Sequence, residues 1–420
     1  MPHRNPTKKQ ALDYHQFPKP GKISVVASKP MVTQKDLSLA YTPGVAIPCL
    51  EIQKNAENAY KYTSKANLVA VISNGTAVLG LGNLGALASK PVMEGKSILF
   101  KKFSGLDSFD IEVDTEDIDS FCNTVKAISP TFGGINLEDI KAPECFEIER
   151  RLVEELDIPV MHDDQHGTAV ISTAATINAC KLAGKVIQNL KVVVVGAGGA
   201  AISCARLYRH LGVRSIYMID SKGVIHAGRS DLNDYKREFA DHHYKTHSEV
   251  FENADVVLGL SKPGSFCIED IEKMSENPIV FSLANPTPEV FPDDVKKARP
   301  DAIVATGRSD FDNQVNNVLG FPFIFRGAMD VRARTINIEM KLAAAHALAE
   351  LATKEAPAYL NEIYNKELKY GKDYIIPKPF DKRLIVEISS AVAKAAIDSG
   401  SSSLKDFDLA NYKEELAKLI

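Results

Sequence analysis

The sequence contains no tryptophan, and none of its six cysteines belongs to a CxxC pair. Cysteines so widely scattered fit neither a disulfide framework nor a zinc site, so we expect reduced, mostly buried thiols. They are Cys49, Cys122, Cys145, Cys180, Cys204 and Cys267. The longest nearly uncharged run, 192–205, is rich in glycine and falls short of the roughly 20 residues that a membrane helix needs.

The chain lacks a large excess of either positive or negative charge. The chain has 50 basic and 54 acidic residues, a net charge of −4, which provides no global positive field for nucleic acid. Hydrophobic residues at 45% and charged residues at 25% exclude wholesale disorder and a coiled-coil rod. The polar amino terminus resembles no secretory signal. We therefore expect a cytoplasmic globular protein with no nucleic-acid and no membrane partner.

The texture of the sequence changes between residues 165 and 190. The first half is rich in Gly/Pro-punctuated loops, with apolar runs that predict short strands at 68–73 and 97–100. A helix is predicted from Thr168 to Gly184, and five Val/Ile-rich runs then alternate with helical stretches. These runs are 191–195, 215–220, 254–260, 278–284 and 302–306. The alternation predicts a doubly wound α/β fold with parallel strands, followed after about residue 330 by helices.

A glycine-rich turn follows the first of these runs. KVVVVGAGGAA places Gly196, Gly198 and Ala201 after a strand and at the start of a helix, the context of a dinucleotide-binding turn. Asp220 ends the next run, where a carboxylate can accept hydrogen bonds from the adenosine ribose. The alternative is a purely structural turn.

A second GxGxxG match, at Gly80, Gly82 and Gly85, lacks this context. Pro91 follows it, and no acid ends a following strand. Packing of a glycine loop explains it as well as ligand contact does.

Two acidic pairs carry the next candidate chemistry. Glu138 and Asp139 lie in GGINLEDIKAP, and Asp163 and Asp164 follow an apolar run that predicts a strand at 158–161. Oxygen donors in such pairs suit Mg²⁺ or Mn²⁺, although solvated surface charge is the alternative. No HExxH pair is present, so we interpret the neighbouring His162 and His166 as packing residues rather than zinc ligands.

Two further residues are distinguished by their setting. Tyr41 precedes Pro43 and Gly44, which hold it at the edge of a loop. Lys96 precedes the apolar run 97–100, where burial would depress its pKa and make it a base. The ordinary alternatives are an edge-packing tyrosine and a lysine with its ammonium group in water.

Together these segments resemble the malic enzyme family, in particular its short bacterial-type members without a phosphotransacetylase-like extension. The matching segments are SLAYTPGVA, VISNGTAVLGLGNLG, VMEGKSILFK, GGINLEDI, HDDQHGTA, VVVVGAGGAA, IDSKG, LANPTPE and NQVNNVLGFPFIFRG. The resemblance implies oxidative decarboxylation of L-malate to pyruvate and CO₂, with NAD or NADP and with Mg²⁺ or Mn²⁺. It also implies a homodimer or higher homo-oligomer, whose interface we expect near residues 8–62.

The resemblance also implies residue roles. Tyr41 would be the proton donor and Lys96 the general base, supported by Asp163. Substrate would contact Asn285 and Asn317. The expected metal ligands are Glu138, Asp139 and Asp164. The expected cofactor-binding residues are Gly196, Ala197, Gly198, Gly199, Ala200, Ala201, Asp220 and Lys222.

One departure from the family concerns the substrate. Larger members carry an arginine for a malate carboxylate where this chain has Ala77, and an alanine cannot pair with a carboxylate. The cofactor preference is also open. Asp220 would repel a 2′-phosphate and favour NAD⁺, whereas Lys222 would offset that repulsion.

The predicted organisation is a loop-rich catalytic α/β domain at 1–165, a Rossmann-type NAD(P)-binding domain at 166–400 and a C-terminal helix at 401–420 that packs on the core. Two other functions stay open. One is a related dehydrogenase of another small hydroxy or amino acid that does not decarboxylate it, and the other is a non-catalytic nucleotide sensor.

Overall fold

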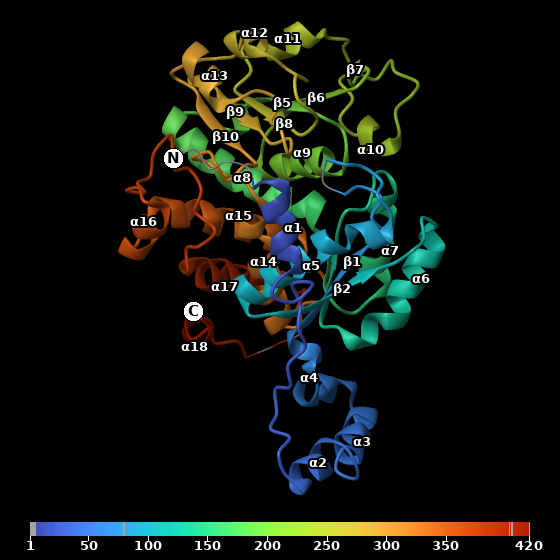
Figure 1. Ribbon diagram of the computed structural model, residues 1–420. Coiled ribbons are helices and arrows are strands. Elements are labelled where there is room, and N and C mark those ends of the chain that lie inside the picture. Colours follow the sequence, from blue (N-terminus) through green and yellow to red (C-terminus); the bar gives the residue numbers. More distant parts are fainter. Residues whose placement is uncertain (1–5, 79, 403, 405, 420) are drawn as a thin grey trace.

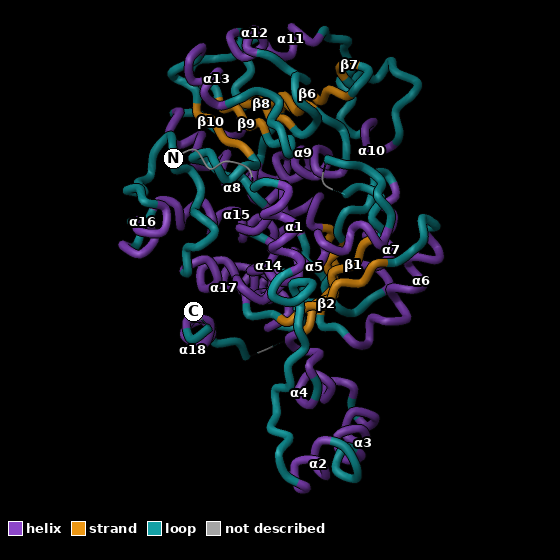
Figure 2. The backbone as a smooth tube through the Cα atoms, in the orientation of Figure 1, coloured by secondary structure: helices purple, strands orange, loops and turns teal. Residues whose placement is uncertain are grey.

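A computed structural model describes residues 6–78, 80–402, 404 and 406–419. Two sheets, one parallel and one parallel except for a single strand, lie in separate parts of the body, with helices between and around them (Figure 2). The first sheet has the order β2-β1-β3-β4, and all of its strands are parallel. Its strands are β1 (Leu68–Ser73), β2 (Asp107–Glu112), β3 (Gly134–Leu137) and β4 (Val160–His162). The predicted strands at 68–73 and near 158–161 are therefore confirmed.

The second sheet has the order β10-β9-β8-β5-β6-β7. Only β7 is antiparallel to its neighbour, so the doubly wound α/β prediction is confirmed. Its strands are β5 (Lys191–Val195), β6 (Ser215–Asp220), β7 (Gly223–Val224), β8 (Val256–Gly259), β9 (Ile279–Ser282) and β10 (Ile303–Thr306). The strand order reverses at β5, which lies between β6 and β8, and such a switch point is where open α/β sheets bind ligands.

The prediction of a strand at 97–100 is wrong, because these residues lie inside helix α5 (Ala86–Ser104). Met93, Ser97, Phe100 and Ser104 recur at helical spacing and are buried, so the helix turns one face to the core. A four-residue apolar run cannot reveal this period when read alone. The helix ends at Gly105, whose φ of 70° suits glycine.

Helix α8 (Asp163–Ala183) connects the two sheets and is buried over most of its length. It starts immediately after β4 and packs against α9 (Gly199–Leu211) and α15 (Ile338–Thr353). The side-chain amide of Asn178 donates to the carbonyl oxygens of Ala349 and Ile375, at 2.8 and 2.9 Å. Small residues along α8 allow this close approach, which ties the two parts of the body together.

The remaining helices surround these elements. Towards the C-terminus, α14 (Phe321–Asp330) and α17 (Arg383–Asp398) pack on one another, and α18 (Leu409–Ala417) packs on α17. The others in the body are α6 (Ile118–Ile128), α7 (Glu144–Glu155), α10 (Asp234–Arg237), α11 (His247–Phe251), α12 (Ile268–Glu272), α13 (Pro292–Ala298) and α16 (Ala358–Tyr364). The chain thus turns helical near its end, as predicted.

The amino-terminal segment forms four helices outside the core. In Figure 1, α1 (Lys8–Gln16) lies against the body, whereas α2 (Gln34–Ala40) and α3 (Ala46–Lys54) project away from it, and α4 (Ala59–Tyr62) leads back. Within the described residues 8–62, none of the four helices contains a buried residue. We call residues 22–62 the arm. Its exposed apolar side chains include Leu37, Leu39, Val45, Ile47 and Leu50.

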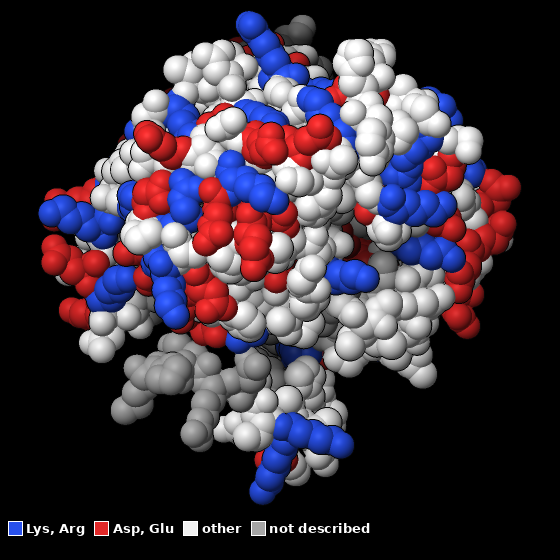
Figure 3. Space-filling view, turned by 90° about the horizontal axis from the view of Figure 1, so that it is seen from above, with Lys and Arg blue, Asp and Glu red and all other residues white. Residues whose placement is uncertain are grey.

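Surface charge is mixed over the part of the body that carries the second sheet. Figure 3 shows basic and acidic side chains interleaved across this face, in keeping with the small net charge of −4. Among the described helices, none has both the length and the apolar character to span a lipid bilayer.

An aromatic cluster joins the first sheet's helix to the C-terminal helices. The fully buried ring of Phe100 contacts Phe321 and Phe325 edge-on, with ring centroids 4.8 and 5.4 Å apart. Replacing Phe100 by alanine should lower the free energy of unfolding by about 3–5 kcal/mol, because it removes this burial and leaves a cavity. Urea unfolding would measure the loss. The control is Phe291→Ala at a 44% exposed ring, which should cost at most about 1 kcal/mol; equal losses would contradict the prediction.

Candidate active site

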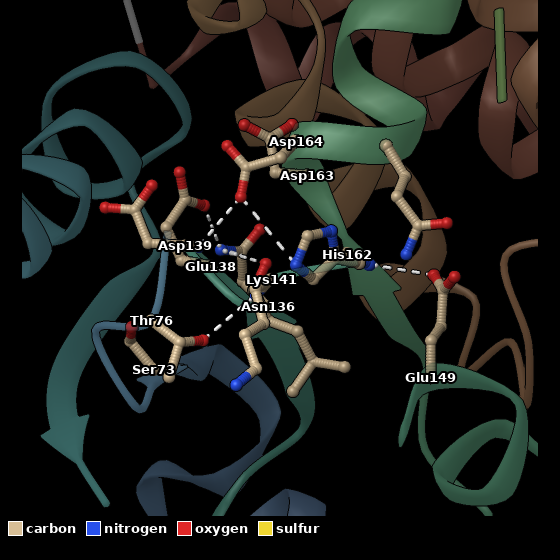
Figure 4. Close-up of polar contacts among 12 residues, drawn as sticks. Ser73, Thr76, Asn136, Glu138, Asp139, Lys141, Glu149, His162, Asp163 and Asp164 are labelled. Atoms are coloured by element: carbon tan, nitrogen blue, oxygen red, sulfur yellow. Dashed lines mark hydrogen bonds and ion pairs between the residues drawn. The ribbon is translucent and has the colours of Figure 1, made fainter. Parts of the chain in front are cut away.

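The two acidic pairs meet because their strands are neighbours. β3 ends at Leu137, just before Glu138 and Asp139, and β4 ends at His162, just before Asp163 and Asp164. Leu137 and His162 are paired in the parallel ladder, so both pairs emerge at the same edge of the sheet. Figure 4 shows Asp164 above Asp139 and Glu138, between them and the His162 ring.

Glu138, Asp139 and Asp164 form a compact group of oxygen donors. One carboxylate oxygen from each lies within 4.8 Å of the others. The backbone N–H of Asp139 donates to Asp164 Oδ2 at 2.7 Å, which fixes the two loops against each other. Burial, together with the neighbouring Asp164 charge, raises the pKa of Glu138 well above its usual range. Three carboxylates held this close fit a hard divalent cation such as Mg²⁺ or Mn²⁺, which relieves their repulsion.

Lys96 extends from α5 into this group. Its Nζ lies 2.6 Å from Asp163 Oδ2 and 2.8 Å from Glu138 Oε1, and it sits over the Phe321 ring, 4.3 Å from the centroid. Burial by itself lowers the pKa of Lys96, but the nearby carboxylates outweigh burial and raise it. The prediction of a depressed pKa is therefore wrong for the protein without a bound cation. The sequence could not reveal this effect, because Glu138 and Asp163 are far from Lys96 along the chain and approach its ammonium group only in the folded protein.

Asp163 is fully buried and held by more than the lysine. Asn317 Nδ2 donates to Asp163 Oδ2 at 3.2 Å, and Thr168 Oγ1 donates to Asn317 Oδ1 at 3.0 Å. Gly167 faces this pair: a Cβ there would come within 2.0 Å of Asp163 Oδ1. The position therefore excludes any side chain, and Asp163 keeps one orientation toward Lys96.

The glycine-rich turn lies across a cleft from the carboxylates. The Gly196 N–H donates to the Ile219 carbonyl at 2.8 Å, and a Cβ on Gly196 would approach the Leu260 carbonyl to 2.5 Å. Gly198 is the N-cap of α9 and has no side-chain cap, and Gly198, Gly199 and Ala200 line the cleft, so the start of this helix borders the cleft as in phosphate-binding turns. The cleft has a volume of about 750 Å³. Its lining includes Lys96, Glu138, Asp139, Asp164, Gly198, Gly199, Ala200, Asn285 and Asn317.

Tyr41 is not brought into this cleft within one chain. It ends α2 in the projecting arm, 68% exposed, and the described residues that line the cleft do not include it. Figure 1 shows the arm extending away from the body. The sequence places Tyr41 near a loop edge correctly, but it cannot show that this loop projects away from the cleft of the same chain.

Three further residues line the cleft that the sequence analysis did not assign to the site, or assigned no definite role. Lys141 follows the Glu138–Asp139 pair and lines the cleft, and its Nζ is paired with Glu116 Oε2 at 2.6 Å. Ala77 lines the cleft too, and its N–H donates to the Asp139 carbonyl at 2.9 Å. Gly80, from the second glycine motif, packs so tightly that a Cβ would come 2.5 Å from the Asn285 carbonyl. That motif therefore packs the loop of Asn285 at the rim of the cleft.

The two histidines differ in their surroundings. His166 Nε2 lies 2.8 Å from Glu149 Oε2, behind the cleft, and burial lowers its pKa. His162 lines the cleft with its Nε2 3.7 Å from Asp164 Oδ2. The three-carboxylate group includes neither of them.

Comparisons with known proteins agree with this geometry. Residues 165–366 match the family model "Malic enzyme, NAD binding domain", and residues 20–117 and 115–153 match "Malic enzyme, N-terminal domain". The crystal structure of malic enzyme from Pyrococcus horikoshii is 42% identical, with a TM-score of 0.89 over 98% of this chain and 95% of that chain.

Two curated bacterial relatives are more similar in sequence. An NADP-dependent malic enzyme of Halomonas elongata is 58% identical over 93% of this chain and 93% of its own length. A probable NADP-dependent malic enzyme of Rickettsia prowazekii is 57% identical over 97% of this chain, which spans only 54% of that relative. By its two family domains and by these similarities over more than nine tenths of its own length, the chain belongs to the malic enzyme family.

Proposed function

We propose that the protein catalyses the oxidative decarboxylation of L-malate to pyruvate and CO₂, using NAD(P)⁺ and a divalent cation. The observation that carries the proposal is the position of Lys96. It is buried between Asp163 and Glu138, in a cleft that also holds the three-carboxylate group and the glycine turn. Base, cation site and dinucleotide turn thus share one space of a size suited to small ligands.

In this proposal Lys96 accepts the proton of the malate C2 hydroxyl. The Lys96 amine must be neutral before it can accept this proton, although the surrounding carboxylates raise its pKa. Those carboxylates include the proposed cation ligands, so their charge is compensated in the loaded enzyme and the lysine can release its proton. When bound, the cation supplies electrophilic stabilisation of the C2 oxygen and the nicotinamide supplies the hydride acceptor.

Asp163 and Asn317 orient the base rather than react. Asp163 is fixed by Asn317, so it directs the Lys96 ammonium group to one place. Asn285 lines the cleft opposite, where its side chain is available to malate or the nicotinamide amide. Lys141 lines the cleft, and we propose that it binds a malate carboxylate in place of the arginine absent at Ala77, exchanging the Glu116 carboxylate that its Nζ contacts at 2.6 Å for that of malate.

We propose a homodimer in which Tyr41 enters the cleft of the partner subunit and protonates C3 of the product enol. Three features support this arrangement. Tyr41 is exposed in a projecting arm, the arm carries apolar side chains that lack a covering surface, and the cleft of the same chain contains no tyrosine among its described lining residues. Exposed apolar faces of this kind mark protein interfaces. A second copy that buries them would also complete the site.

We also propose the domain division 1–165, 166–400 and 401–420. The separate sheets and the two family matches support the first boundary, although α8 crosses it without a break. A cytoplasmic location is supported by the six cysteines, all of which are free thiols.

The reaction is tested by mixing the full chain with L-malate, Mn²⁺ and either nicotinamide cofactor. We expect reduced cofactor together with equimolar pyruvate. Lys96→Met should lower kcat by about 10²–10⁴-fold, since it removes the general base. Lys101→Met, on the exposed side of the same helix, is the control and should leave kcat unchanged. Reduced cofactor without pyruvate would instead indicate a dehydrogenase that does not decarboxylate.

Cation binding is tested without turnover, by calorimetric titration of Mn²⁺ after EDTA treatment and dialysis. Asp139→Asn should weaken binding by at least about tenfold, because the site loses one of three anionic ligands. Asp157→Asn, an exposed acid paired with Arg334, should bind as the wild type does. Equal affinities of all three proteins would contradict the assignment of the carboxylates.

The shared site is tested by complementation. Tyr41→Phe and Lys96→Met chains should each be nearly inactive alone, yet co-expression should restore about a quarter of wild-type activity. Half of the dimers would be mixed, and each mixed dimer would contain one intact site and one doubly mutated site. If Tyr41 served its own chain, every site would keep one substitution and no activity would return. Sedimentation of the wild type as a monomer at micromolar concentration would also contradict the proposal.

A further inference from the structure

Glu289 is a buried glutamate behind the wall that the second sheet contributes to the cleft. It follows β9, is only 5% exposed and is not among the described residues that line the cleft. Its Oε1 accepts from the Ser261 N–H at 3.0 Å, and its Oε2 accepts from the Ala284 N–H at 3.1 Å. Ser261 and Ala284 each lie two residues beyond the last residues of β8 and β9, which are paired in the sheet. One carboxylate therefore joins the segments that follow two neighbouring strands.

A glycine makes room for this carboxylate. A Cβ at Gly259, the last residue of β8, would come within 2.6 Å of Glu289 Cδ and within 2.8 Å of both carboxylate oxygens. Position 259 therefore excludes a side chain while Glu289 keeps its place. The main chain adds a further contact, since the Gly264 N–H donates to the Glu289 carbonyl oxygen at 3.0 Å. Both the side chain and the main chain of Glu289 thus hold the segment after β8.

Glu289 receives hydrogen bonds but no opposing charge. Among the described residues, its carboxylate is paired with no lysine, arginine or histidine, and burial raises its pKa against the effect of the backbone N–H groups. A carboxylate is costly to bury unless its oxygens are hydrogen-bonded, as both are here. A glutamine would turn an NH₂ group toward one of the two N–H donors and could serve only the other. The position therefore requires two acceptor oxygens.

Both joined segments line the cleft. Residues 260–261 belong to the first segment, and residues 283–285 belong to the second. The Leu260 carbonyl packs against the glycine turn at Gly196. The Asn285 side chain packs against Gly307, where a Cβ would come within 2.8 Å of Asn285 Nδ2. Glu289 thus connects the wall beside the dinucleotide turn with the wall beside Asn285.

We propose that Glu289 is a positioning residue: by joining the segments after β8 and β9, it holds Asn285 in the place from which that side chain contacts malate. The inference rests on the proposed function, in which Asn285 is available to malate. Glu289 acts from outside the cleft lining, through the backbone of the two segments. The alternative is a link that only stabilises the sheet, and weakening such a link would leave the recognition of malate unchanged.

Amide hydrogen exchange of the full chain, without ligands, tests the link itself. The Ser261 and Ala284 amides lie beyond the strands, and we expect them to be protected in the wild type because Glu289 accepts from both. In Glu289→Gln, at least one of the two amides should exchange about tenfold faster. Glu289→Asp, whose side chain is too short to reach both donors, is a second variant with the same expected result. Unprotected amides in the wild type, or unchanged exchange in the variants, would overturn the inference.

Steady-state kinetics tests the positioning role. Glu289→Gln should lower kcat/KM for malate by about tenfold, while the Mn²⁺ affinity stays at its wild-type value because the carboxylates belong to the first sheet. In an Asn285→Ala chain the same substitution should cost less than about twofold more, since it acts through Asn285. Glu276→Gln, an exposed acid before β9 at the opposite end of that strand, is the matched control and should behave as the wild type does.

Additive losses in the double variant, or a parallel loss of Mn²⁺ affinity, would indicate a general structural effect and overturn the inference. The exchange measurement involves neither malate nor turnover, so the two proposals can fail separately. A wild type that keeps the expected protection but does not oxidise malate would reject the proposed reaction. Malate oxidation with an unchanged kcat/KM in Glu289→Gln would reject this inference alone.

Discussion

Four carboxylates and one ammonium group are forced together at the floor of the cleft, and the rest of the site depends on this unequal collection of charge. Glu138 and Asp163 are buried and the Lys96 side chain is only 11% exposed, so solvent provides little screening. The carboxylates are held together despite their mutual repulsion because β3 and β4 end at the same edge of the sheet and α8 starts directly after β4. The amino terminus of α8 favours negative charge at Asp163 and Asp164.

The same excess of negative charge connects the parts of the mechanism. It raises the pKa of Lys96, and in the proposed reaction a cation bound by the carboxylates would offset this effect and allow the lysine to lose its proton. Helix α8 carries this organisation to the second sheet, since its buried face packs on α9 behind the glycine turn. Helix α8 therefore carries two of the carboxylates at its first turn and packs closely against α9 along the rest of its length.

Much of this arrangement is predictable from sequence because it is local. The five Val/Ile-rich runs became strands, and the glycine turn follows its strand as expected, because both patterns extend over a few neighbouring residues. The acidic pairs were predicted as candidate cation ligands from their local pattern, but their proximity depends on the pairing of β3 with β4, which the sequence did not predict. Malic enzyme membership followed from many short motifs in order.

The failures share a different cause. The helix that contains Lys96 was missed because the four-residue run 97–100 is too short to show a helical repeat. The pKa of Lys96 was wrongly predicted because it depends on acids 42 or more residues away in the sequence. The carboxylate of Asp220 is paired with an arginine and a lysine that lie 9 and 16 residues beyond it and meet it only through tertiary packing. The exposure of Tyr41 depends on how the arm leaves the body, which no local pattern encodes.

The direct join between β4 and α8 limits how the molecule can move. No loop separates His162, the last residue of the strand, from Asp163, the first of the helix. A long helix resists sharp bending in the absence of proline, so Asp163 and Asp164 are fixed both to the end of β4 and to a rigid helix. The spacing of these two carboxylates from Glu138 and Asp139 is therefore set by the sheet and by α8, and not by a flexible loop.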